Sequence, residues 1–235
     1  MSTAEYRQAP LLISGSYIGW LRGLLDTMLP SRFREYELEE MPEDEAIELV
    51  RNYARLYEVP ITEDVAYAMA TLCEGNPFYV SAVFDSDVHE RDLSTRDGLL
   101  TTLEFETLHS RGYIRRMWME YLGKVFSTVN QENAKNIVFH LSQNREREVS
   151  RRELMKELGL KLSEGELEER VHALVKADII EEGSSNMYYR GVQDNIFDKV
   201  FRGKYAEDIR SFDPQEIRHE YKAMYEKTLH DLHVM

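Results

Sequence analysis

The chain has 235 residues, 43% of them hydrophobic and 11% aromatic, a composition that excludes intrinsic disorder and allows one large domain or two to three small ones. It has no apolar run long enough to span a membrane and no signal-peptide pattern at its start, and its single cysteine, Cys73, excludes internal disulfides, so we expect a soluble cytoplasmic protein. Acids outnumber bases 43 to 29, for a formal charge of -14, so DNA binding would need a local basic patch.

The first elements predicted along the chain are a short strand, a helix and a second strand. Leu11 to Ile13 is an apolar run that stops in Ser14-Gly15-Ser16, as a buried parallel strand does at the edge of a sheet. Apolar residues then recur at helical spacing from Ile18 to Met28, before Pro30, and Phe33 to Leu38 alternates like a strand. One strand–helix–strand unit cannot bury a parallel sheet, so another part must complete it.

From Pro42 onward the pattern is helical. Acids in the first turn open one helix, and Thr62 is suited to cap the next. The break at Gly75-Asn76-Pro77 separates the second helix from a third. The first predicted helix has Pro42 in its first turn and an apolar stripe from Ala46 to Leu56, and the second follows the Thr62 cap and carries Val65, Met69 and Leu72. Residues 78–84 start another helix and residues 99–121 are again helical, whereas the charged stretch from Asp85 to Asp97 is predicted to be an exposed connector.

The region from residue 127 to 201 has the order of a winged helix, with three helices followed by a β-hairpin. The first helix covers Glu132 to Leu141. Ser150 caps the second, which Gly159 closes, and Ser163 begins the third. The glycine-containing turn 181–186 leads to a strand, and the chain ends in an acidic helix predicted from Tyr205 onward.

Five segments, in this order, resemble the archaeal-ATPase family of P-loop NTPases, which is of the AAA+/STAND-like kind. Ile13-Ser14-Gly15-Ser16 is similar to the end of its sensor-one strand. Leu29-Pro30-Ser31-Arg32 resembles its Pro-Leu-x-Gly-Arg segment, with serine in place of glycine and the first pair inverted. Residues 36–42 resemble the strand and loop before its lid. Gly75 to Tyr79 is similar to its Gly-x-Pro motif, and Tyr189 to Asp194 to its Tyr-Arg-x-x-Asp stretch.

The resemblance implies a chain that is mainly α with minor β. Residues 1–40 would be a remnant of the P-loop α/β sheet, 41–124 a helical lid, 125–203 a winged-helix domain and 204–235 a helical tail. It also implies an ATP-driven switch that uses ATP and Mg²⁺. The chain has no Gly-x-x-x-x-Gly-Lys-[Ser/Thr] sequence and no buried strand ending in Asp-Glu. We therefore expect this chain alone to be inactive and to bind no cofactor, as a truncated protein or one product of a split gene.

Four residues are candidates for the nucleotide site, if the missing ATPase core is supplied. Ser16 could orient the attacking water, although ordinary turn chemistry explains it equally well. Arg32 could stabilise the transferred phosphoryl group, but solvated arginines are commoner. Gly75 and Pro77 would lie near the adenine, or would serve only to break a helix. No metal site is expected, because the pair His230 and His233 has no third ligand nearby.

A basic cluster and an acidic helix bear on the partners. The cluster consists of Arg145, Arg147, Arg151 and Arg152, and acids interleave with it. The third helix carries a strong excess of glutamates, which would repel the major groove. We expect the winged helix to bind protein partners, and the first expected partner of the chain is the missing ATPase core or upstream half. DNA binding should be weak at most, and no membrane contact is expected. The unpaired strand edge before residue 40 favours a homodimer, or packing of that segment on the lid.

Two alternatives from other functional classes stay open. One is a winged-helix DNA-binding transcriptional regulator. The other is a non-catalytic adaptor that binds proteins through its lid helices.

Overall fold

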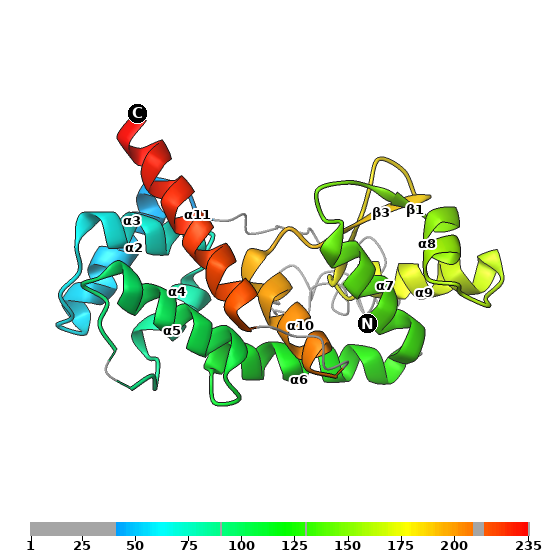
Figure 1. Cartoon of the computed structure of the whole chain (residues 1–235), viewed down its shortest axis with the longest axis horizontal. Helices are drawn as coiled ribbons and strands as arrows, with labels where there is room; N and C mark the ends of the chain where they lie inside the picture. The colour runs from blue at the N-terminus through cyan, green and yellow to red at the C-terminus, as the bar shows by residue number, and fades with distance from the viewer. Residues whose placement is uncertain (1–40, 90, 130, 209–213, 235) are drawn as a thin grey trace, which may run out of the picture.

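The computed structural model describes residues 41–89, 91–129, 131–208 and 214–234, and this part of the chain is mainly α with minor β, as predicted. The elements predicted before residue 41 lie outside the described residues. Figure 1 shows an elongated arrangement of helices with a small sheet toward one end. In chain order the elements are α2 (Glu43–Leu56), α3 (Glu63–Leu72), α4 (Pro77–Phe84), α5 (Arg96–Leu108), α6 (Tyr113–Thr128), α7 (Gln131–Gln143), β1 (Val149–Ser150), α8 (Arg151–Glu157), α9 (Glu164–Lys176), β2 (Ile180–Glu182), β3 (Tyr188–Gly191), α10 (Asn195–Asp208) and α11 (Pro214–Val234).

Helices α2 to α5 and α11 enclose the first of two apolar cores. Helix α3 is buried on nearly all sides, and its small residues at 66, 68 and 70 let α2 and α11 approach it closely. The predicted cap is confirmed, since the Thr62 hydroxyl accepts from the backbone N–H of Val65 at 3.4 Å. Helix α11, which the sequence predicted as a tail, buries Ile217, Tyr221 and Tyr225 in this core.

The prediction of one helix from residue 99 to 121 is wrong. The chain turns at His109–Gly112 and forms two helices, α5 and α6. A Cβ at Gly112 would lie 2.5 Å from the Glu106 carbonyl oxygen, so only glycine allows this close approach. The buried Glu106 carboxylate accepts from the backbone N–H groups of Tyr113 (2.6 Å) and Ile114 (3.3 Å) and thereby caps α6.

The second core lies among the end of α6, helices α7 to α9 and the sheet. Its strands are antiparallel in the order β1-β3-β2, with Val149 opposite Tyr189 and Ile180 opposite Gly191. The predicted caps are confirmed: Ser150 accepts from the N–H of Glu153, and Ser163 forms a capping box with Glu166. The predicted hairpin turn is also present.

Helix α10 borders both cores. Ile196 and Val200 are buried in the first core, and Phe197 and Phe201 in the second, because residues one position apart face different sides of a helix. Figure 1 shows α10 between the two ends of the molecule, above α6. The sequence predicted helix only from Tyr205 onward, whereas α10 begins at Asn195.

Candidate functional site

Two segments that the sequence singled out, Gly75 to Tyr79 and Tyr189 to Asp194, lie side by side where the two cores meet. Hydrogen bonds join them or their immediate neighbours across more than a hundred residues of chain. We call the side chains that make these bonds the junction. They are Glu74, Tyr79, Trp118, Asp194 and Asn195.

Glu74 is held in a left-handed backbone conformation, with φ of 53°. It follows Cys73, the C-cap of α3, where the N–H groups of Glu74 and Gly75 bond to the carbonyls of Thr71 and Ala70 and close the helix. Glycine is the usual residue at that position, so a glutamate there carries strain. Its carboxylate accepts from the backbone N–H of Asn195 at 3.1 Å and from that residue's side-chain amide, which offsets the strain.

Asp194 forms the other contact of the junction. One carboxylate oxygen accepts from the Tyr79 hydroxyl at 2.5 Å, and the other accepts from the N–H of Phe197 at 2.8 Å and caps α10. The indole N–H of Trp118 donates to the Tyr79 oxygen at 3.1 Å. Burial raises the pKa of Asp194 above its ordinary value, and burial together with this carboxylate raises the pKa of Tyr79. The tyrosine therefore stays a hydrogen-bond donor.

A group of buried and half-buried charges extends the junction along α10. Arg202 contacts Asp198 at 2.8 Å and Glu220 of α11 at 2.5 Å, and Lys199, which is 2% exposed, lies 3.6 Å from Glu220. Burial lowers the pKa of Lys199. Burial by itself raises the pKa of Glu220, but hydrogen bonds from Arg202 and its charge outweigh burial and leave that pKa below its ordinary value. Arg145 of the segment after α7 approaches Asp198 to 3.6 Å. These pairs connect α10 to α11 and to the segment after α7.

The predicted nucleotide residues divide into two groups. Ser16 and Arg32 lie outside the described residues. Gly75 is buried with φ of 63°, and a Cβ there would come within 2.7 Å of the Met41 carbonyl oxygen. Pro77 is exposed at the first position of α4, and Asn76 caps that helix. The helix-breaking interpretation explains both residues, and contact with a nucleotide stays a prediction.

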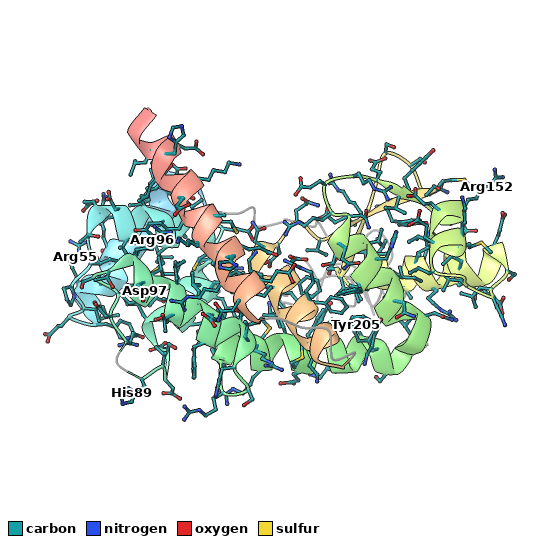
Figure 2. All side chains as sticks on the ribbon, viewed as in Figure 1. Arg55, His89, Arg96, Asp97, Arg152 and Tyr205 are labelled. Atoms are coloured by element: carbon teal, nitrogen blue, oxygen red, sulfur yellow. The ribbon has the colours of Figure 1, made fainter. Side chains whose placement is uncertain are left out.

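Acids of the same region pair with two of the four arginines in the predicted basic cluster. Arg147 bonds to Glu153 at 2.7 Å, and Arg151 bonds to Glu168 at 2.9 Å. Figure 2 shows Arg152 at the far end of the molecule. Residues Arg147, Arg151, Arg152, Glu153, Glu164, Glu168 and Glu169 are called the α8–α9 face below. Its arginines are largely neutralised within the chain, as their interleaving with acids in the sequence indicated.

The remaining predictions concern the single cysteine, a metal site and membrane-spanning helices. Cys73 is fully buried in the first core, as predicted, and burial raises the pKa of its thiol. Within the described ranges, no three His, Cys, Asp or Glu side chains are grouped so that they could hold a metal ion. None of the helices in this part of the chain is both long and apolar enough to cross a membrane.

Comparison with known proteins gives no assignment, since no protein-family model matches the chain and no curated protein does so. No sequence pattern marked Glu74, Trp118 or Asn195 as a site residue. Tyr79 and Asp194 stood out only as parts of the two motifs. The local signal is a tyrosine within the largely apolar helix α4, because a buried tyrosine needs a partner for its hydroxyl.

Proposed function

We propose that this chain is the carboxy-terminal regulatory portion of a P-loop ATPase of the archaeal-ATPase kind, not catalytic alone. In this proposal residues 41–124 are the lid and 125–203 the winged helix. A separate ATPase core would bind ATP and Mg²⁺ and drive the motion of both, in the cytoplasm.

One observation carries the proposal. The segment that resembles the lid motif and the segment that resembles the stretch after the winged helix bond to each other through the junction. A displacement of the lid helix α4 would pull on Asp194 and so on the start of α10. An ATPase whose lid responds to nucleotide needs such a connection to transmit the response.

The topology of residues 131–191 supports the winged-helix assignment. A helix, a short strand, two helices and a hairpin follow one another, and the first strand pairs with the last. The paired arginines and exposed glutamates of the α8–α9 face favour a protein partner over DNA, because phosphate contacts supply most of the affinity for DNA. This favours the adaptor alternative over the transcriptional regulator.

The test of the proposal is a reconstitution. The coding sequence upstream of this chain is expected to contain a Gly-x-x-x-x-Gly-Lys-[Ser/Thr] sequence, and its product is expected to bind this chain and hydrolyse ATP with it. The chain alone should bind no Mg-ATP in a calorimetric titration. A micromolar dissociation constant for the chain alone would contradict the proposal.

DNA binding separates the alternatives. We expect association with duplex DNA that is abolished by about 150 mM salt, since the Debye length is then only about 8 Å. Sequence-selective binding that survives this salt concentration would favour the transcriptional regulator. Binding of the upstream product without any ATPase activity would favour the adaptor.

A further inference from the structure

The connection between α5 and α6 presents aromatic rings and guanidinium groups at the surface. We call residues 105–116 the arginine turn, and Figure 1 shows this connection at the lower edge of the molecule. Tyr113 is 53% exposed, and His109, Arg111 and Arg116 are exposed as well. Because tyrosine and arginine are enriched where proteins bind partners, the arginine turn is a candidate interaction surface.

Both of these guanidinium groups lie over an aromatic ring. The guanidinium carbon of Arg111 is 5.7 Å from the ring centre of Phe105, and that of Arg116 is 5.8 Å from the ring centre of Tyr113. Neither guanidinium group forms an ion pair or a hydrogen bond with another described residue. A ring covers only one face of the planar group, so the N–H donors along its edge can still bind the oxygen atoms of an anion.

Contacts inside the molecule hold the arginine turn in shape. The buried Glu106 carboxylate, which accepts from the N–H of Tyr113, also accepts from the Ser86 hydroxyl at 2.6 Å. The His109 ring stacks on Phe105 with ring centres 4.6 Å apart, and its Nδ1 accepts from the backbone N–H two residues on, at 3.2 Å. The rings and guanidinium groups are therefore positioned before a partner arrives, which lowers the entropic cost of binding.

The local charge of the arginine turn is positive, although the whole chain has a formal charge of -14. Residues 107–119 contain no aspartate or glutamate. The exposed and half-buried acids that flank them along the chain are paired: Glu104 accepts from Arg218 at 2.6 Å, and Glu120 accepts from Lys124 at 2.7 Å. This surface therefore favours an anionic partner.

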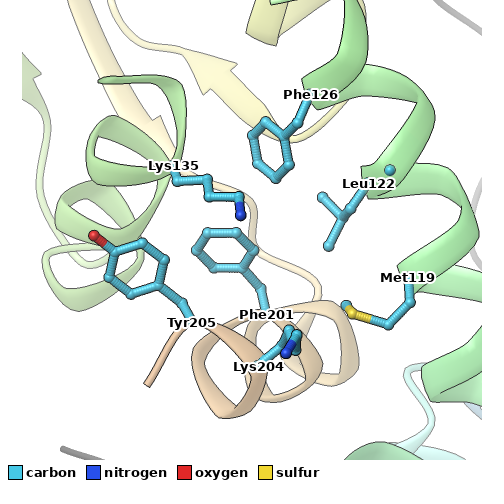
Figure 3. A pocket seen from close by; sticks show the side chains of 8 residues that line it. Met119, Leu122, Phe126, Lys135, Phe201, Lys204 and Tyr205 are labelled. Atoms are coloured by element: carbon cyan, nitrogen blue, oxygen red, sulfur yellow. The ribbon is translucent and has the colours of Figure 1, made fainter. Parts of the chain in front are cut away.

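A second group of aromatic rings near α6 shows what distinguishes Tyr113. Figure 3 shows these rings around an apolar pocket of about 210 Å³ between α6, α7 and α10. They stack on one another, since the ring centre of Tyr205 lies 4.4 Å from that of Phe139 and 6.0 Å from that of Phe201. The ring of Tyr113 also has a neighbour, Phe78 at 5.4 Å, yet more than half of the residue's surface faces solvent. A further ring can therefore stack there.

We propose that the arginine turn binds single-stranded nucleic acid, with phosphate groups at Arg111 and Arg116 and a base stacked on Tyr113. The exposed ring favours nucleic acid over an acidic protein, because every base has a flat face to stack and a carboxylate side chain has none. A single strand is favoured over a duplex, because paired bases already stack on each other and leave no face for the tyrosine. The proposal concerns this chain whether or not an ATPase core binds it.

Fluorescence anisotropy of the whole chain with a labelled oligothymidylate of about ten nucleotides tests the proposal. We expect a dissociation constant of about 100 μM or lower at about 50 mM salt, and weaker binding of a duplex of the same length. Two phosphate contacts predict a slope of about -1.4 for the logarithm of the binding constant against that of the salt concentration. Polyglutamate should not displace the oligonucleotide. Absence of binding, equal binding of the duplex, or displacement by polyglutamate would overturn the proposal.

Two sets of variants locate the site. Tyr113→Ala should weaken binding by about tenfold, the contribution of one stacked base, whereas Tyr113→Phe, which keeps the ring, should bind as wild type. The double variant Arg111→Gln/Arg116→Gln should lose most of the salt dependence. The matched control, Arg152→Gln/Tyr188→Ala, changes an exposed arginine of α8 and an exposed tyrosine of β3 and should leave binding unchanged. Undiminished binding by a Tyr113→Ala protein whose circular dichroism matches wild type would contradict the proposal.

Discussion

The junction and the α8–α9 face are both built from charged and polar side chains, but they differ in burial. At the junction Tyr79 is 2% exposed and has one acidic partner, Asp194. On the face, the Arg147 side chain is 47% exposed and that of Glu153 is 30% exposed. A buried donor that loses its acceptor costs about 1–3 kcal/mol, whereas an exposed ion pair contributes about 0–1 kcal/mol. The degree of burial, and not the number of charges, therefore decides which region contributes more to the free energy of unfolding.

The largest expected effect follows from Asp194→Ala. The substitution leaves the Tyr79 hydroxyl and the N–H of Phe197 without their acceptor, so the free energy of unfolding should fall by about 3 kcal/mol. Urea denaturation measures this. Asp194→Asn, which keeps an oxygen for the helix cap, should lose only about 1 kcal/mol. An alanine variant within about 0.5 kcal/mol of wild type would show that the junction carries little energy.

Two substitutions of Glu74 separate the stabilisation from its hydrogen bonds from the cost of its left-handed backbone conformation. Glu74→Ala loses the bonds to Asn195 and keeps an unfavourable left-handed residue, so we expect a loss of about 2 kcal/mol. Glu74→Gly loses the same bonds but relieves the strain, so it should lose about 1 kcal/mol. The comparison is made under identical urea denaturation conditions. A glycine variant less stable than the alanine variant would contradict the assigned conformation.

Glu220→Gln should have an effect that depends on pH. The pKa of Glu220 is lower in the folded chain than its ordinary value, so its stabilising contribution is complete above that value, about 4.3. It is lost as the pH falls through the lower folded pKa. Because the side chain is 34% exposed, screening limits the loss at pH 7 to about 1 kcal/mol. Urea denaturation at about pH 3 should show a smaller difference between variant and wild type, and an unchanged difference would exclude the lowered pKa.

The smallest effect is expected on the α8–α9 face. Arg147→Ala removes an exposed pair with Glu153 and should change the free energy of unfolding by no more than about 0.5 kcal/mol. Urea denaturation at low and high salt checks this. A loss comparable to that of Asp194→Ala would remove the distinction between the two regions.

The sequence predicted those helix starts that are fixed by residues adjacent in the chain. Thr62, Ser150 and Ser163 cap helices as expected, because a cap bonds within its own first turn. The turn before α6 was missed because Glu106, which caps that helix, lies within the preceding helix. Helix α10 was missed although Asp194 is a good cap.

The junction could not be predicted from one sequence. Tyr79 and Asp194 are 115 residues apart, and Glu74 and Asn195 are 121 apart. Hydrophobic periodicity reports which side of an element is buried, but not which polar groups meet across the core. The motif resemblance placed both segments in order along the chain without placing them together in space.

Hydrogen exchange tests the central claim, that the junction makes the two cores respond as one. Amides of α3 report on the first core and those of α9 on the second. In the wild-type chain the slowest amides of both helices should open with the same free energy, because the cores unfold together. In Asp194→Ala the two values should separate. Different values in the wild type, or equal values in the variant, would contradict the account.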